Sequence, residues 1–117
     1  MQAPAITTAI PRQRYQLGGY QVVALAEIES GDARRYQYIL AFVRDGDTKP
    51  GLYVTCEKNP RAKRQEGSHC LRIVSEPLTE ELGSSDRWAD LEAFAQEGLR
   101  LGAQVLGLGD ESPYRLG

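Results

Sequence analysis

The sequence predicts an α+β fold in which a four-stranded antiparallel meander sheet packs one face on a long C-terminal helix. Four runs of apolar or alternating residues lie between residues 20 and 75, and short turn-like links without a helix join them. After residue 84, apolar residues recur at helical spacing instead. A chain of 117 residues suits one domain that can bury a core without disulfides or metal.

The two ends of the chain lack the regular patterns of its middle. Residues 1–14 are expected to be a flexible N-terminal arm, because Pro4 and Pro11 interrupt any regular pattern. The domain is expected over residues 15–106, and residues 107–117 are expected to be a loose C-terminal tail.

The first two strands are predicted over residues 20–29 and 35–43, where β-branched and aromatic residues are enriched. The period of two places alternate residues of the second strand on opposite faces. One face carries Tyr36, Tyr38, Leu40 and Phe42, and the other carries Ile39, Ala41 and Val43. The Asp45-Gly46 pair that follows is a hairpin signal.

Two further strands are predicted over residues 51–57 and 68–75. Arg72 gives the last of them a mixed face, which is typical of an edge strand. One helical turn is expected over residues 79–82, between Pro77 and Gly83.

The long helix is expected to begin near Ser84, Ser85 or Asp86, which are all good N-cap residues. Gly98 is expected to mark a close backbone contact or an imperfect helix, and Gly102 is expected to be the residue just past the helix end. The stripe that would pack on the sheet consists of Trp88, Leu91, Phe94, Ala95 and Leu99.

The two central strands are apolar on both faces, yet the chain supplies only one long helix to cover them. The second face therefore needs a partner, a second copy of the chain or a ligand. A homodimer is the simplest solution, and a shallow ligand groove is the other. The residues assigned to this partner or ligand face are Tyr36, Tyr38, Leu40, Phe42 and Tyr53.

Charge is unevenly distributed along the chain. Residues 1–72 contain eleven Lys and Arg against seven Asp and Glu, while residues 73–117 contain three against nine. No stretch approaches the roughly 18 apolar residues of a membrane span, and residues 1–11 do not read as a secretory signal. We therefore expect a cytoplasmic protein with no membrane partner.

The run from Lys58 to Arg64 is the strongest functional candidate. It holds Lys58, Arg61, Lys63 and Arg64 within seven residues, a pattern that suits a nucleic-acid or polyanion-binding loop. Arg12, Arg14, Arg34 and Arg35 are candidate helpers, and tyrosines of the sheet could stack on bases. The competing interpretation is an ordinary solvated loop that discourages edge aggregation.

Few residues suggest catalysis. His69 is the only histidine, and Cys56 falls opposite Cys70 if the last two strands form a hairpin centred near Lys63. That pairing raises the hypothesis of a redox pair, against two buried thiols as the default. Spacing for a zinc site, a phosphate-binding loop or a dinucleotide fingerprint is missing, so no catalytic residue, metal or cofactor is assigned.

Three functions remain open from the sequence. The favoured one is a small non-catalytic interaction or adaptor domain that forms a homodimer through the second sheet face. The first alternative is a nucleic-acid or polyanion binder that uses residues 58–64. The second alternative is an enzyme with a small-molecule pocket on the sheet face.

Overall fold

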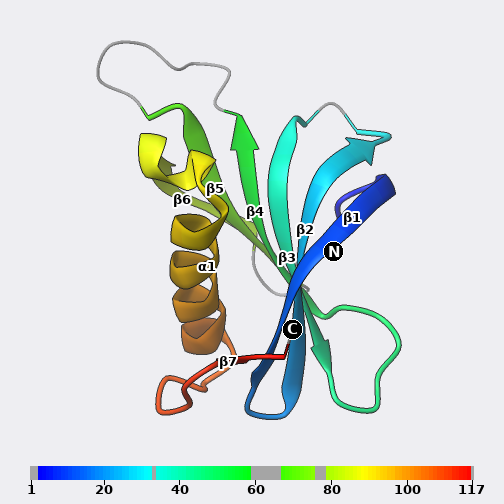
Figure 1. Ribbon diagram of the computed structural model, residues 1–117, viewed down its shortest axis with the longest axis vertical. Coiled ribbons are helices and arrows are strands. Elements are labelled where there is room, and N and C mark those ends of the chain that lie inside the picture. Colours follow the sequence, from blue (N-terminus) through cyan, green and yellow to red (C-terminus); the bar gives the residue numbers. More distant parts are fainter. Residues whose placement is uncertain (1–2, 33, 59–66, 76–78, 117) are drawn as a thin grey trace.

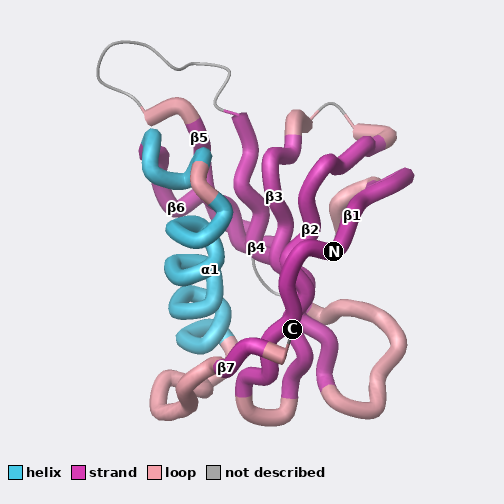
Figure 2. Tube along the Cα trace, in the orientation of Figure 1, coloured by secondary structure: helices cyan, strands magenta, loops and turns pink. Residues whose placement is uncertain are grey.

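The computed structural model describes residues 3–32, 34–58, 67–75 and 79–116. Within these residues, seven strands form one antiparallel sheet in the order β6-β5-β4-β3-β2-β1-β7, and one α-helix packs on it (Figure 1). Figure 2 shows the same path with the helix on one side of the twisted sheet. The α+β class and the antiparallel sheet are therefore confirmed.

The prediction of a four-stranded sheet is wrong, because the sheet contains three further strands that were not predicted. The expected strands correspond to β2 (Tyr20–Ser30), β3 (Tyr36–Arg44), β4 (Leu52–Lys58) and β5 (His69–Ser75), which lie side by side in sequence order. The additional strands are β1 (Ile6–Leu17), β6 (Thr79–Ser85) and β7 (Tyr114–Arg115).

Strand β1 occupies most of the segment that was expected to be a flexible arm. It pairs with β2 along its length, with three register shifts that interrupt the alternation. Pro11 is tolerated there because only β2 and the two-residue β7 pair with β1, and β7 meets it at Tyr15 and Gln16. Two residues of the expected loose tail are thus part of the sheet.

Strand β6 replaces the helical turn that was expected over residues 79–82, and it moves β5 away from the edge. Its residues are exposed or nearly so, so they need no apolar alternation and left no strand signal in the sequence. A short 3-10 helix, η1 (Asp86–Ala89), follows and leads into α1 (Leu91–Val105).

Helix α1 begins one turn later than expected. Asp90 is its N-cap and accepts a hydrogen bond from the Ala93 backbone N–H, while Ser85 caps η1 instead. Gly102 lies inside the helix, not past its end. A Cβ atom at Gly98 would overlap Leu40, and one at Gly102 would overlap the ring of Phe42, so both glycines permit close helix–sheet packing.

The core lies between α1 and one face of the sheet. Phe94, Ala95, Leu99 and Ala103 of α1 meet strand residues that are almost fully buried. These strand residues include Leu17, Val22, Ala24, Leu40, Phe42, Leu52, Val54, Cys56 and Leu71. None of the described helices is long and apolar enough to cross a membrane.

The opposite face of the sheet is not an open apolar surface. Ile39, Thr55 and Val74 lie on it and are buried, and Leu25 and Tyr53 beside them are half-buried. Ladder partners share a face, which places these residues together across β2 to β5. The premise that this whole face awaits a cover is therefore wrong for its centre.

Candidate functional site

A cleft opens where β2 and β3 separate. Their ladder ends at the pair Ala26 and Tyr38, and beyond it the two strands spread apart (Figure 1). The cleft measures about 900 Å³, a size typical of small-molecule sites. Its lining comes from β1, β2, β3, β4, α1 and the connection between β2 and β3. It consists of Arg12, Ala26, Glu27, Ile28, Glu29, Arg34, Arg35, Tyr36, Gln37, Tyr38, Lys58 and Leu91.

Strand β2 bends at the cleft through an unusual backbone conformation. Glu27 has φ +50°, a left-handed value that is uncommon outside glycine. Its carboxylate accepts a hydrogen bond from Arg12 Nη2 at 2.7 Å in an exposed ion pair. Such conformations persist where the surrounding structure imposes them, and they concentrate at functional sites.

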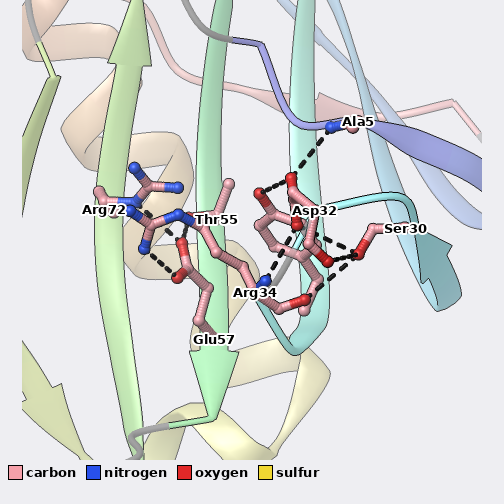
Figure 3. A network of polar contacts seen from close by, with 8 residues as sticks. Ala5, Ser30, Asp32, Arg34, Thr55, Glu57 and Arg72 are labelled. Carbon is pink, nitrogen blue, oxygen red and sulfur yellow. Dashed lines mark hydrogen bonds and ion pairs between the residues drawn. The ribbon is translucent and has the colours of Figure 1, made fainter.

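Asp32 fixes the connection between β2 and β3 that carries the arginines of the cleft. Its carboxylate accepts hydrogen bonds from the backbone N–H groups of Ala5 and Arg34, from Tyr36 Oη at 2.9 Å and from Ser30 Oγ (Figure 3). Partial burial would raise the pKa of Asp32, but these four donors hold it below its usual value. The connection is therefore held from both strands and from the N-terminal segment.

Replacing Asp32 by alanine should lower the free energy of unfolding by about 1–3 kcal/mol, because buried and half-buried donors lose their acceptor. Chemical denaturation of Asp32→Ala measures this loss. Asp47→Ala is the control, because Asp47 is an exposed residue of the β3–β4 hairpin at the other end of the sheet. Equal stability of the two variants would show that Asp32 does not hold the connection.

Glu57 organises a second cluster beside the first. It is 7% exposed and accepts hydrogen bonds from Arg34 Nη1 at 2.9 Å, Arg72 Nε at 2.9 Å and Thr55 Oγ1 at 2.6 Å (Figure 3). Arg34 is half exposed, whereas the Arg72 side chain is mostly buried. Charge-assisted bonds to one carboxylate hold both guanidinium groups in place.

Arg35 and Lys58 are exposed cations of the cleft without an ion pair among the described residues, whereas Arg12 and Arg34 are paired with Glu27 and Glu57. The Lys58 backbone N–H donates to the Arg35 carbonyl oxygen at 2.9 Å, so the ends of β3 and β4 hold the two residues side by side. Arg34 precedes Arg35 on the connection between β2 and β3. Three cations thus gather on the β3–β4 wall, whereas Glu27 and Glu29 lie on the β2 wall.

Tyr38 and Leu91 bring apolar surface into the cleft. The Tyr38 ring stacks on Phe94 of α1 with a centroid distance of 5.8 Å, and its hydroxyl donates to the Ala89 carbonyl oxygen. These contacts fix the ring at the boundary between the cleft and the core. A ligand in the cleft therefore meets a fixed aromatic side chain between two walls of opposite charge.

The structure brings together part of the basic set that was predicted from the sequence. Lys58, Arg12, Arg34 and Arg35 all line the cleft, but Arg14 does not. Arg61, Lys63 and Arg64 lie outside the described residues.

The residues assigned to a partner or ligand face do not share one face. Leu40 and Phe42 are fully buried in the core under α1, and Tyr38 packs beside them. Tyr53 lies on the other face, and so does Tyr36, because a register shift between Tyr36 and Tyr38 pairs Tyr36 with Glu57. The assignment of this set as one face is wrong, while the homodimer itself stays a prediction.

The two cysteines are not opposite each other. Cys70 pairs with Glu57, and Cys56 pairs with Leu71, so the two cysteines point to different faces. No disulfide joins them. Burial raises the pKa of the Cys56 thiol to about 12, and the thiol donates to the Trp88 carbonyl oxygen. Cys56 is thus a buried structural thiol, not a thiolate nucleophile.

His69 is buried, and its Nε2 atom has no hydrogen-bond partner among the described residues, while Nδ1 bonds to Ser68 Oγ at 2.8 Å. Burial, followed by the charge of Lys58, lowers the pKa of His69, and Asp86 opposes the shift. Folding therefore disfavours the charged form of the imidazole. The arrangement indicates a structural histidine.

This shift predicts a pH dependence of stability. Because the folded pKa lies below the unfolded value of about 6.5, the unfolded chain binds more protons between the two values. The free energy of unfolding should therefore fall as the pH drops below about 6.5. Urea titrations of the wild type and His69→Gln across this range test it, and equal slopes for both proteins would contradict it.

Sequence reasoning did not single out Glu27, Glu29, Asp32 or Glu57 for the site. The sequence contained one indication for Glu57, because Glu57 is the last residue of the strand predicted over residues 51–57 and directly precedes the basic run. Within the described part of the chain, no group of three His, Cys, Asp or Glu residues could hold a metal ion. Comparisons with protein families, curated proteins and solved structures find no match to this chain.

Proposed function

We propose that this protein is a non-catalytic binding protein whose ligand is a polyanion that enters the cleft between β2 and β3. The proposal rests on one observation: one wall of the cleft is lined by three cations, Arg34, Arg35 and Lys58. Lys58 is also the first of the four cations in the basic run from Lys58 to Arg64. Cations grouped in this way bind phosphates with release of counterions.

Preorganisation supports binding at this wall. Asp32 fixes the connection that carries Arg34 and Arg35, and Glu57 fixes the Arg34 guanidinium. Side chains and loops that are ordered before binding lose less conformational entropy when the ligand arrives. The hydrogen bonds that hold these residues therefore favour affinity as well as stability.

The pKa shifts of the titratable groups around the cleft favour binding over catalysis. The pKa of Tyr36 is raised by burial and then by its hydrogen bond to Asp32, which keeps the hydroxyl protonated. The pKa of Asp32 is lowered by the bonds that fix the connection. Each shift has a structural cause, and neither prepares a group to exchange protons near neutral pH.

Labelled inorganic polyphosphate should bind the protein at about 50 mM salt, and the affinity should fall steeply at about 200 mM. The double substitution Arg35→Ala and Lys58→Ala should weaken binding about tenfold or more at low salt, since two phosphate contacts are lost. Fluorescence anisotropy measures both effects.

Arg44→Ala combined with Lys49→Ala is the matched control, because it also removes two exposed cations, at the opposite end of β3 and in the connection that follows it. An affinity that drops equally in the control and in the double variant would show general charge attraction in place of a site. Absence of binding at either salt concentration would reject the proposed function.

A further inference from the structure

We infer that the polyanion is single-stranded nucleic acid and that the cleft accepts an unpaired base that carries an amino group. This inference rests on the proposed function and names the ligand class of the same site. The charge of the two walls, the aromatic side chain between them and the size of the cleft carry it.

The walls of the cleft differ in charge. Arg34, Arg35 and Lys58 stand on the β3–β4 side, whereas Glu27 and Glu29 stand on β2. A ligand that is anionic throughout is attracted by the first wall and repelled by the second. A nucleotide suits both walls, because its phosphate is anionic and the amino group of its base is a hydrogen-bond donor.

The two carboxylates are not equivalent. Glu27 is already paired with Arg12 at 2.7 Å. Glu29 is exposed, and no hydrogen bond or ion pair holds it among the described residues. Glu29 is therefore the acceptor available to a base, in the way that carboxylates accept from the amino group of cytosine.

Tyr38 supplies the surface for the base. Its ring is held by Phe94 and by the Ala89 carbonyl oxygen, so stacking on it loses little side-chain freedom. Ala26 and Leu91 extend the apolar lining beside it. Bases stack on such aromatic side chains in proteins that bind single strands, and the cation-lined wall then follows the backbone.

The size of the cleft suits one unpaired nucleotide. About 900 Å³ accommodates a nucleotide with its neighbouring phosphate. A base within a duplex presents neither its stacking face nor its pairing edge to the protein. We therefore assign the cleft to unpaired nucleotides.

Two oligonucleotides of about twelve nucleotides, a length within the usual site sizes, test the inference by fluorescence anisotropy. Oligo-dC and oligo-dT are both pyrimidine strands of equal charge, but only cytosine carries an amino group at the pairing edge. Oligo-dC should bind about fivefold more tightly than oligo-dT. In Glu29→Ala, the affinity for oligo-dT should stay the same or rise, because a repulsive charge is gone. Oligo-dC loses its hydrogen bond in this variant, so the ratio of the two affinities should fall toward one.

Glu81→Ala is the matched control, since Glu81 is an exposed carboxylate on β6, at the far edge of the sheet. It should leave the ratio unchanged. Equal binding of the two oligonucleotides by the wild type would overturn the inference, as would a ratio that does not respond to Glu29→Ala. If polyphosphate still binds through Arg35 and Lys58 in either case, the proposed function stands and only the base preference fails.

Discussion

Replacing Glu57 by alanine is expected to lower the free energy of unfolding by about 3–5 kcal/mol, the largest effect of any single substitution considered for this protein. Glu57 is 7% exposed, and the Arg72 side chain, at 14%, is nearly as buried. Removal of the carboxylate leaves the Arg72 guanidinium without its counter-charge at a position with little access to water. Chemical denaturation followed by circular dichroism measures the loss.

Glu97→Ala is a matched control. Glu97 also accepts a hydrogen bond from an arginine, Arg100 Nε at 2.7 Å, but the Arg100 side chain is 55% exposed. An exposed pair is screened by solvent and contributes little to stability, so this variant should remain close to wild type. A Glu57→Ala protein no less stable than Glu97→Ala would show that the Glu57 cluster does not stabilise the sheet.

Replacing Gly102 by alanine should destabilise the protein by about 1–3 kcal/mol, although alanine is the better helix former by about 1 kcal/mol. A Cβ atom at this position would overlap the Phe42 ring, which is fully buried and cannot move into solvent. Overpacking of the helix–sheet interface should therefore outweigh the gain in helix propensity. Urea denaturation gives the change in stability.

Two comparisons separate packing from propensity. Gln104→Ala places alanine at an exposed position of the same helix and should have little effect or stabilise slightly. Phe42→Leu combined with Gly102→Ala should lose less stability than the two single changes together, because the smaller side chain makes room for the methyl group. A stabilised Gly102→Ala protein would contradict the close packing of α1 on β3.

The middle of the sheet was predictable because the residue pattern of its strands reflects which side chains are buried. Strands β2 to β5 carry continuous apolar or alternating patterns, since their side chains pack on α1 or on the opposite face. The strands on either side of this middle carry no such pattern. Strand β6 has no buried residue, and β1 contains a proline and three register shifts that interrupt its alternation.

Several predicted site residues lie on a different face from the one expected, because the strand register differs by one residue from the prediction. The shift between Tyr36 and Tyr38 places two neighbouring tyrosines on different faces, and a register one residue away from the expected one separates Cys56 from Cys70. A strand has a period of two, so no composition argument detects such a shift. The basic residues were easier to find, because charge in a short run is visible whatever face each side chain takes.

The cleft itself could not be predicted, because it depends on where two strands stop pairing. The residue types around Ala26 and Tyr38 do not indicate that the pairing of β2 with β3 ends there. Glutamate also seldom adopts a positive φ, so the conformation of Glu27 was not expected. Asp32 lies in a Ser-Gly-Asp segment that reads only as a turn. Its four hydrogen bonds come from residues as far apart in the chain as Ala5 and Tyr36.

Nuclear magnetic resonance mapping of the ligand tests the central claim most directly. Backbone amide shifts are recorded while the full chain is titrated with polyphosphate at low salt. The cleft predicts saturable changes at residues 27–29, at 34–38 and at Lys58, with little change at residues 44–47 at the other end of the sheet. Changes spread evenly over exposed cations, or concentrated at residues 44–47, would contradict a binding site between β2 and β3.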